Sequence, residues 1–285
     1  FGYLEQEKME KVCMAGELSL NGEVRGVKGI LPLVDTAIKE GCRLCIIPKE
    51  NLPETQYIHE IPILGIENLR EFMNQAEKEN WGAVRNPKRD WPQSCIEYEE
   101  DFADVLGQET ARQAAVIAAA GFHNLLLIGT KGSGKTMIAN RIPTLFPVLS
   151  REESMEISRI YSAAGLLTGN SPMLMRRPFR APHHTISPTA MAGGGSVPTP
   201  GEITLAHRGI LFLDELPEFR RAALEVLRQP LETHKICISR VNGTYEFPAN
   251  FLLVGAMNPC PCGYYPDRNR CSCTQYQVEQ YLGKL

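Results

Sequence analysis

The octapeptide GTKGSGKT at residues 129–136 constrains the fold more than any other stretch of this sequence. It matches the pattern G-x-x-x-x-G-K-[ST], between an apolar run that predicts a buried strand and a stretch that predicts a helix. In such a P-loop the glycines let backbone N–H groups surround phosphate oxygens at the N-terminus of the helix. We therefore expect an α/β fold that binds ATP through Gly129, Thr130, Lys131, Gly132, Ser133, Gly134, Lys135 and Thr136.

Two other apolar runs end in polar residues that suit the same chemistry. GILFLDE ends in Asp214 and Glu215, and FLLVGAMN ends in Asn258. Ligands of open α/β sheets bind at the carboxyl edge of the strands. We expect Thr136 and Asp214 to hold Mg²⁺, because hard cations prefer oxygen ligands. We expect three catalytic residues, with Lys135 on the β- and γ-phosphates, Glu215 as general base and Asn258 on the γ-phosphate or the attacking water.

Strands that alternate with helices predict a parallel sheet flanked by helices. We expect a small α/β domain over residues 1–80, a linker over 81–97 and a second domain over 98–285. The Gly- and Pro-rich residues 165–202 have no periodicity and predict an insertion into the second domain. A β-hairpin with an Asn-Gly turn is predicted after it.

The composition argues against a membrane protein. It also argues against a protein that coats nucleic acid with a surface that is basic overall. The 285 residues carry a net charge of −3, and no apolar run approaches the roughly 18 residues that span a bilayer. The N-terminal residues lack a signal-peptide pattern, and we expect no membrane partner. Five of the nine cysteines are scattered, which favours a reducing, cytoplasmic location. Because the chain begins with Phe1, we expect a fragment or a processed chain.

The other four cysteines form a CxC…CxC array within 14 residues, namely Cys260, Cys262, Cys271 and Cys273. Four thiolates suit a tetrahedral Zn²⁺ site. The one-residue gaps are shorter than the usual C-x₂₋₄-C spacing of zinc sites. Two interpretations therefore stay open, a structural zinc site and a loop of reduced cysteines without metal.

The predicted insertion concentrates cationic side chains around Phe179. Five of them lie within nine positions, namely Arg176, Arg177, Arg180, His183 and His184. Cationic and aromatic side chains together suit the phosphates and bases of DNA. The alternative is a loop that packs on its own domain or on a neighbouring subunit. The predicted hairpin raises the same question, because Arg240 lies near its tip.

Together these motifs resemble those of the AAA+ ATPases. Longer stretches narrow the resemblance to the magnesium-chelatase-related family typified by the competence protein ComM, also called YifB. They include RPFRAPHHTISPTAMAGGG, PGEITLAHRGILFLDELPEF and NFLLVGAMNPCPCGYY, and the similarity covers nearly all of residues 99–285. The resemblance implies a ring of subunits, a hexamer, with ATP between them. For ComM-type members it implies ATP-driven branch migration of DNA, so that DNA is the expected partner of the full-length protein.

Residues 17–52 resemble the proteolytic domain of Lon, but Leu31 stands where Lon carries its catalytic lysine. We therefore expect a partial Lon-like domain without protease activity. The family's trans-acting arginine and helical lid would follow residue 285, so we expect this chain to bind ATP more readily than it hydrolyses it. Two alternatives to a DNA motor stay open. One is a chelatase-type remodelling ATPase that acts on a partner protein, and the other is a nucleotide-binding module without turnover.

Overall fold

The structure, a computed structural model, describes most of the chain. The described residues are 9–77, 91, 98–167, 173–195, 198–240 and 243–284, with the side chains of Glu77 and Arg240 excluded. The predicted linker therefore lies outside the described residues, apart from Trp91. Among the helices that the structure describes, none is both long and apolar enough to cross a membrane.

Contacts divide the chain into two compact units. The N-terminal unit comprises Phe1–Ser94 and Ser150–Leu174, and the sheet unit comprises Cys95–Leu149 and Met175–Leu285. The segment 150–174 therefore groups with the N-terminal unit, whereas the sequence had placed it within a continuous second domain. Sequence order alone does not show this grouping, because it depends on which apolar surfaces meet after folding.

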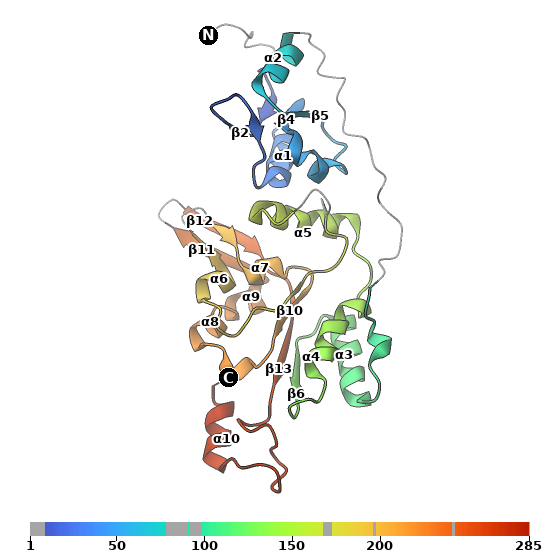
Figure 1. Ribbon diagram of the computed structural model, residues 1–285, viewed down its shortest axis with the longest axis vertical. Coiled ribbons are helices and arrows are strands. Elements are labelled where there is room, and N and C mark those ends of the chain that lie inside the picture. The colour runs from blue at the N-terminus through green and yellow to red at the C-terminus, as the bar shows by residue number, and fades with distance from the viewer. Residues whose placement is uncertain are drawn as a thin grey trace. The chain divides into compact units, whose positions relative to one another are not determined.

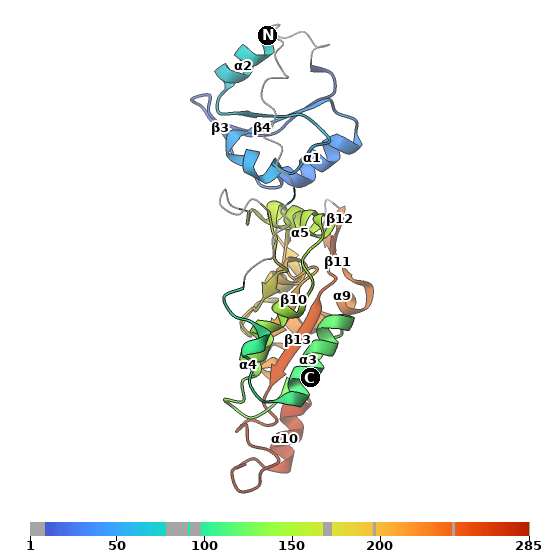
Figure 2. The same ribbon diagram turned by 90° about the vertical axis from the view of Figure 1, so that its right-hand side faces the viewer.

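The N-terminal unit is built on a three-stranded parallel sheet in the order β1-β4-β5. Its elements are β1 (Val12–Met14), β2 (Glu17–Leu18), β3 (Val24–Arg25), α1 (Ile30–Lys39), β4 (Leu44–Pro48), η2 (Lys49–Thr55), β5 (Ile63–Ile66), α2 (Leu69–Glu77) and α5 (Arg151–Ala164). Cys45 and Ile47 pack with α1, whereas Leu44 and Ile46 pack with Phe72 of α2. Helices α1 and α2 thus cover opposite faces of the sheet (Figure 2), which explains why β4 is apolar throughout.

Helix α5 packs against α1 within the N-terminal unit. Met155 of α5 contacts the core formed by α1 and β4. On the rim of this contact, Arg159 Nη2 lies 2.7 Å from Asp35 Oδ1. The helix begins with a capping box, in which the Ser150 hydroxyl and the Glu153 carboxylate each accept the other's backbone N–H. Its N-terminus is therefore set by local sequence, and its position by apolar packing.

The sheet unit contains a four-stranded parallel sheet in the order β6-β13-β10-β7. Its elements are η3 (Phe102–Asp104), α3 (Glu109–Gly121), β6 (Leu125–Ile128), α4 (Lys135–Arg141), η4 (Ile142–Leu145), β7 (Phe179–Arg180), α6 (Pro188–Ala192), β8 (Gly193–Gly194), β9 (Thr199–Pro200), α7 (Glu202–Leu205), β10 (Ile210–Leu213), η5 (Leu216–Glu218), α8 (Arg221–Glu225), α9 (Arg228–Thr233), β11 (Lys235–Arg240), β12 (Gly243–Pro248), β13 (Leu252–Met257) and α10 (Gln275–Leu282). The predicted parallel sheet flanked by helices is confirmed.

Helices cover both faces of this sheet (Figures 1 and 2). Ile210 and Phe212 of β10 face a core shared with α3 and α4. Leu211 and Leu213 face a second core, shared with α6 and α7. Because neighbouring side chains of a strand point to opposite faces, a strand between two helical layers must be apolar throughout. Polar residues are then left to the ends of the strands.

The predicted insertion is partly regular where the structure describes it. It contributes β7 at the edge of the sheet beside β10, helix α6 and the short β8–β9 pair. The following hairpin pairs β11 with β12 in antiparallel register, from Lys235 opposite Pro248 to Arg240 opposite Gly243. The two residues at its tip, 241 and 242, are outside the described part of the chain.

Candidate nucleotide site

Three neighbouring strands bring the predicted site residues to one edge of the sheet. β6 leads into the P-loop, β10 ends one residue before Asp214, and β13 ends one residue before Asn258. β13 lies between β6 and β10 and is parallel to both (Figure 1). The three carboxyl ends therefore open on the same side, which is where ligands of open α/β sheets bind.

The shape of the P-loop depends on its glycines. Gly132 and Gly134 have φ angles of 76° and 81°, in the left-handed region that favours glycine. Helix α4 begins at Lys135 directly after this turn. The side-chain amide of Gln108 donates a hydrogen bond to the carbonyl of Ser133 (2.5 Å) and tethers the loop to the start of α3. This geometry suits a loop whose backbone N–H groups surround an anion.

The ammonium group of Lys135 lies between the P-loop and the end of β13. It donates to the carbonyl oxygens of Gly129 (2.8 Å) and Thr130 (3.0 Å) and to Oδ1 of Asn258 (3.1 Å). Burial lowers the pKa of Lys135, and the carboxylate of Asp214 opposes this shift. Phosphate oxygens would offer the ammonium group stronger, charge-assisted hydrogen bonds than these neutral oxygens do.

Thr136 and Asp214 lie together beside the P-loop. The Thr136 hydroxyl donates to Oδ2 of Asp214 (2.8 Å), and Oδ1 of Asp214 accepts the backbone N–H of Glu215 (2.9 Å). A hydroxyl and a carboxylate are hard oxygen donors of the kind that Mg²⁺ takes beside substrate phosphates. This pair of side chains therefore fits Mg²⁺.

These residues line a cavity of about 630 Å³. Small-molecule sites usually measure ~300–1,000 Å³, so the size suits a nucleotide. Besides the predicted residues, the lining includes Pro261 and Cys262 from the cysteine array. Sequence reasoning did not assign either of them to the nucleotide site. The available signal was that the first cysteine of the array follows Asn258 by only two positions.

Glu215 has a neighbour that the sequence did not indicate. Its Oε2 lies 3.7 Å from Nδ1 of His184. The His184 ring also meets the ring of Phe219 edge-on, with 6.4 Å between their centroids. The backbone of Glu215 has a φ of 52°, which is uncommon for a residue with a side chain. His184, which the sequence places in the cationic stretch around Phe179, therefore lies beside the predicted general base.

Arginines of the insertion also have partners inside the sheet unit. Nη1 of Arg177 donates to the carbonyl oxygen of Arg208 (2.9 Å). The guanidinium of Arg176 lies 5.1 Å from the centre of the Tyr98 ring. The side chain of Arg240 is outside the described residues. DNA contact by these arginines stays a prediction, and the contacts of the first two support the alternative of packing on their own unit.

Arg180 forms a bidentate ion pair with Glu202. Its Nε and Nη2 donate to the two carboxylate oxygens, each at 2.7 Å. Planar, two-point pairs of this kind are among the stronger polar contacts in proteins. The Arg180–Glu202 pair connects the edge strand β7 to helix α7, so we assign Arg180 a structural role within the sheet unit.

Replacing Arg180 with alanine is expected to destabilise the sheet unit by roughly 1–3 kcal/mol, because Glu202 loses its bidentate partner. The side chains of Arg180 and Glu202 are 32% and 21% exposed, so water replaces only part of the hydrogen bonding that the Glu202 carboxylate loses. Thermal unfolding followed by circular dichroism measures the effect. The control is Arg221→Ala, which removes an arginine that is 87% exposed and is expected to change little. Equal melting temperatures for Arg180→Ala and wild type would contradict the structural role.

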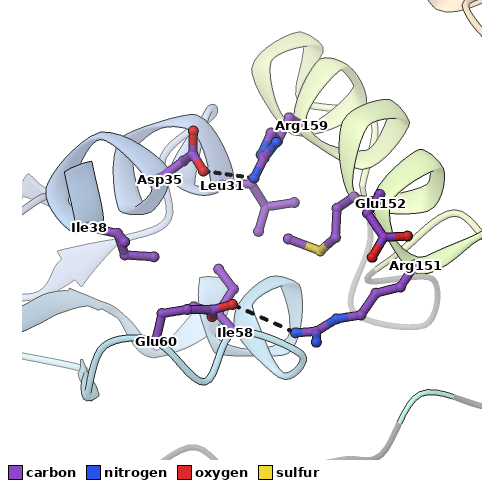
Figure 3. Close-up of a pocket in the computed structure, with 9 residues that line it drawn as sticks. Leu31, Asp35, Ile38, Ile58, Glu60, Arg151, Glu152 and Arg159 are labelled. Carbon is purple, nitrogen blue, oxygen red and sulfur yellow. Dashed lines mark hydrogen bonds and ion pairs between the residues drawn. The ribbon is translucent and has the colours of Figure 1, made fainter.

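A second pocket, of about 300 Å³, lies in the N-terminal unit beside the buried side chain of Leu31 (Figure 3). Four of its charged side chains form two ion pairs, since Arg159 lies 2.7 Å from Asp35 and Arg151 lies 3.9 Å from Glu60. The described lining consists of apolar, acidic and arginine side chains and includes no serine, cysteine or lysine. The described lining therefore offers none of the side chains of a Ser-Lys catalytic pair.

The four cysteines of the array converge in the loop between β13 and α10. Their Sγ atoms all lie within 4.8 Å of one another. Cys260 is buried and the other three are half-buried. The loop leaves the same edge of the sheet at which the P-loop lies (Figure 1). The four predicted zinc ligands are thus brought together.

A parallel sheet with a P-loop after one strand, an asparagine after the adjacent strand and an acid after the next strand defines an α/β domain of the P-loop nucleotide-binding class. The family model described as magnesium chelatase, subunit ChlI, matches residues 101–285, and a second one, subunit ChlI of Mg-chelatase, matches residues 2–51. The chain belongs to the magnesium chelatase subunit ChlI family.

Curated relatives resemble nearly the whole chain. The uncharacterized protein YifB of Escherichia coli is 43% identical over 99% of this chain, and the competence protein ComM of Haemophilus influenzae is 40% identical over 99%. An uncharacterized protein of Mycobacterium tuberculosis is 44% identical over 98%. The chain covers 54–55% of these relatives, so it spans about half of their length. The resemblance to the YifB and ComM proteins is confirmed.

Proposed function

We propose that this chain is the ATP-binding part of an ATP hydrolase that works, in the full-length protein, as a ring-forming DNA motor. The observation that carries the nucleotide part is the convergence of Lys135, Thr136, Asp214 and Asn258 at one edge of a parallel sheet. These four side chains come from three different strand ends. A purely structural role would not require them to line one open cavity together.

In the proposed reaction each side chain has its own task. Lys135 and the P-loop N–H groups bind the β- and γ-phosphates. Asn258, which already accepts a hydrogen bond from Lys135, orients the γ-phosphate or the attacking water. Glu215 accepts the proton of that water as general base. Thr136 and Asp214 hold Mg²⁺, which when bound neutralises charge on the phosphate oxygens.

The DNA part of the proposal is supported by the similarity to the competence protein ComM and by the branch migration that a ComM-type resemblance implies. A ring of six subunits, with ATP between neighbours, would surround the DNA. The alternative is a chelatase-type remodelling ATPase that acts on a partner protein. The description of the matching family as a magnesium chelatase subunit favours that alternative.

ATP hydrolysis by the full-length protein is expected to rise severalfold when branched or single-stranded DNA is added. DNA bound in the ring would favour the subunit arrangement that hydrolyses ATP. Phosphate release measured with and without each DNA tests this. Hydrolysis that no DNA stimulates would count against the motor and favour the chelatase-type alternative. ATP binding without any hydrolysis would leave a nucleotide-binding module.

For the N-terminal unit we infer a Lon-like fold without peptidase activity. Leu31, at the position of the catalytic lysine of Lon, is an apolar side chain only 1% exposed in the core of the unit. Both arginines that line the adjacent pocket are paired with acidic side chains of the same pocket. Incubation of the full-length protein with unfolded casein tests this inference, and cleavage that depends on this unit would contradict it.

A further inference from the structure

The cysteine array folds into a compact cluster of thiols. Cys260 Sγ lies 3.3 Å from Cys262 Sγ and 3.8 Å from Cys271 Sγ, and the latter two are 3.5 Å apart. With Cys273 included, all four sulfur atoms lie within 4.8 Å of one another. A tetrahedral Zn²⁺ ion with Zn–S bonds of about 2.3 Å would place its sulfur ligands about 3.8 Å apart. The observed spacing therefore fits a single tetrahedral ion.

The same spacing argues against a larger metal cluster. Iron–sulfur clusters also take four cysteine ligands. They insert several iron and sulfide ions between the thiolates, which requires a wider separation of the ligands than 4.8 Å allows. A single ion with four thiolate ligands in tetrahedral geometry is the usual form of a structural zinc site.

Backbone turns support the sulfur ligands. The N–H of Gly263 donates to the carbonyl of Cys260 (3.0 Å) in a turn that needs a positive φ, here 87°. The N–H of Tyr265 donates to Cys260 Sγ (3.4 Å). The N–H of Cys271 donates to the carbonyl of Asp267 (2.7 Å). Hydrogen bonds around the ligands orient them toward a metal, so the loop backbone is arranged around the position of the ion.

This loop also forms one wall of the nucleotide cavity. Pro261 and Cys262 line that cavity together with residues 131–137 of the P-loop and the start of α4. A Cβ atom placed on Gly263 would lie 3.7 Å from the backbone nitrogen of Lys131, so the turn lies directly against the P-loop. An interaction that orders the loop from Cys260 to Cys273 therefore also positions this wall of the nucleotide cavity.

We propose that the four cysteines bind one Zn²⁺ ion and that this ion holds the turn at residues 261–263 against the P-loop, so that nucleotide affinity depends on zinc. The proposal rests on the nucleotide binding proposed above and adds a metal site that controls it. Without the ion, only weak S–H···S contacts link the thiols, and the wall is in place for only a fraction of the time. The apparent affinity for nucleotide is then multiplied by that fraction.

Zinc content of the full-length protein, purified without chelators, tests the metal site. We expect about one zinc per chain, because four preassembled thiolates bind zinc tightly. The double variant Cys271→Ser/Cys273→Ser removes two ligands and changes no residue that lines the cavity, and it should contain less than about a tenth of an equivalent. Cys237→Ser, an exposed cysteine on β11, is the matched control and should keep its zinc. Wild-type protein without zinc, or with iron in its place, would overturn the proposal.

Binding of a fluorescent ATP analogue in the presence of Mg²⁺ tests the coupling. We expect about tenfold weaker binding for the double variant, as for a wall in place about a tenth of the time. Wild-type protein stripped of zinc by a chelator should show the same loss, and ZnCl₂ should restore its affinity. The measurement on chelator-treated wild-type protein tests the coupling even if the double variant fails to fold.

The outcomes separate the two proposals. Equal nucleotide affinity with and without zinc would overturn the coupling and leave the proposed ATPase function intact. Absence of nucleotide binding by the zinc-loaded wild type would overturn both the coupling and the ATPase proposal. Loss of nucleotide affinity on zinc removal, with recovery on zinc addition, supports the coupling, provided that Cys237→Ser binds nucleotide as the wild type does.

Discussion

Replacing Lys135 with alanine is expected to weaken ATP binding by roughly 100-fold or more. Its ammonium group contacts two P-loop carbonyl oxygens and Oδ1 of Asn258, at the place where the phosphates of a nucleotide would lie. Charge-assisted hydrogen bonds contribute roughly 1.5–3 kcal/mol each, and 1.4 kcal/mol corresponds to a factor of ten. Titration of the variant with a fluorescent ATP analogue measures the loss.

The matched control for this variant is Lys49→Ala. Lys49 belongs to the N-terminal unit and pairs with Glu67 at 2.6 Å, so its removal changes the net charge equally. We expect ATP affinity within about twofold of the wild type for this control, because Lys49 does not line the nucleotide cavity and exposed ion pairs contribute little. Affinity of Lys135→Ala close to that of Lys49→Ala would show that the P-loop does not bind phosphates.

Glu215→Gln is expected to leave ATP binding intact and to slow hydrolysis by roughly 10²- to 10⁴-fold, the usual contribution of a general base. Glutamine keeps the size of the side chain but cannot accept the proton of the attacking water. The side chain of Glu215 is 60% exposed at the cavity, next to His184. Phosphate release and nucleotide binding measured on the same full-length sample separate the two effects.

Glu218→Gln is the control for that variant. Glu218 lies three positions further along, on η5, and pairs with Lys284 at 3.7 Å. It does not line the cavity, so its hydrolysis rate should stay close to that of the wild type. A Glu215→Gln protein that hydrolyses ATP within about threefold of this control would exclude Glu215 as the general base, since a general base contributes roughly 10² or more.

The convergence of the residues of the candidate nucleotide site was largely predictable because it depends on short-range patterns. A P-loop needs fixed residue types within eight positions, and its glycines need positive φ angles that few other residues adopt. Asp214 and Asn258 were found by another local rule, since each follows an apolar run. The parallel sheet then brings the ends of those runs to one edge.

The roles of the insertion were less predictable. The clustered arginines suggested contact with DNA, and local sequence does not contain their partners. Arg180 pairs with Glu202, which is 22 positions away. Arg177 donates to the carbonyl of Arg208, 31 positions away. The sequence identifies a charged side chain, whereas its partner depends on which distant segment the fold places beside it.

The sequence by itself determined the family, the P-loop, the acidic and amide strand ends and the four candidate metal ligands, because each is encoded by neighbouring residues. Tertiary structure alone decided which of these features meet. It placed helix α5 with the N-terminal unit, His184 beside Glu215 and the cysteine loop against the P-loop. The physical reason is that burial of apolar surface is non-directional and acts between distant segments. The contacts that it creates are therefore not encoded in local spacing.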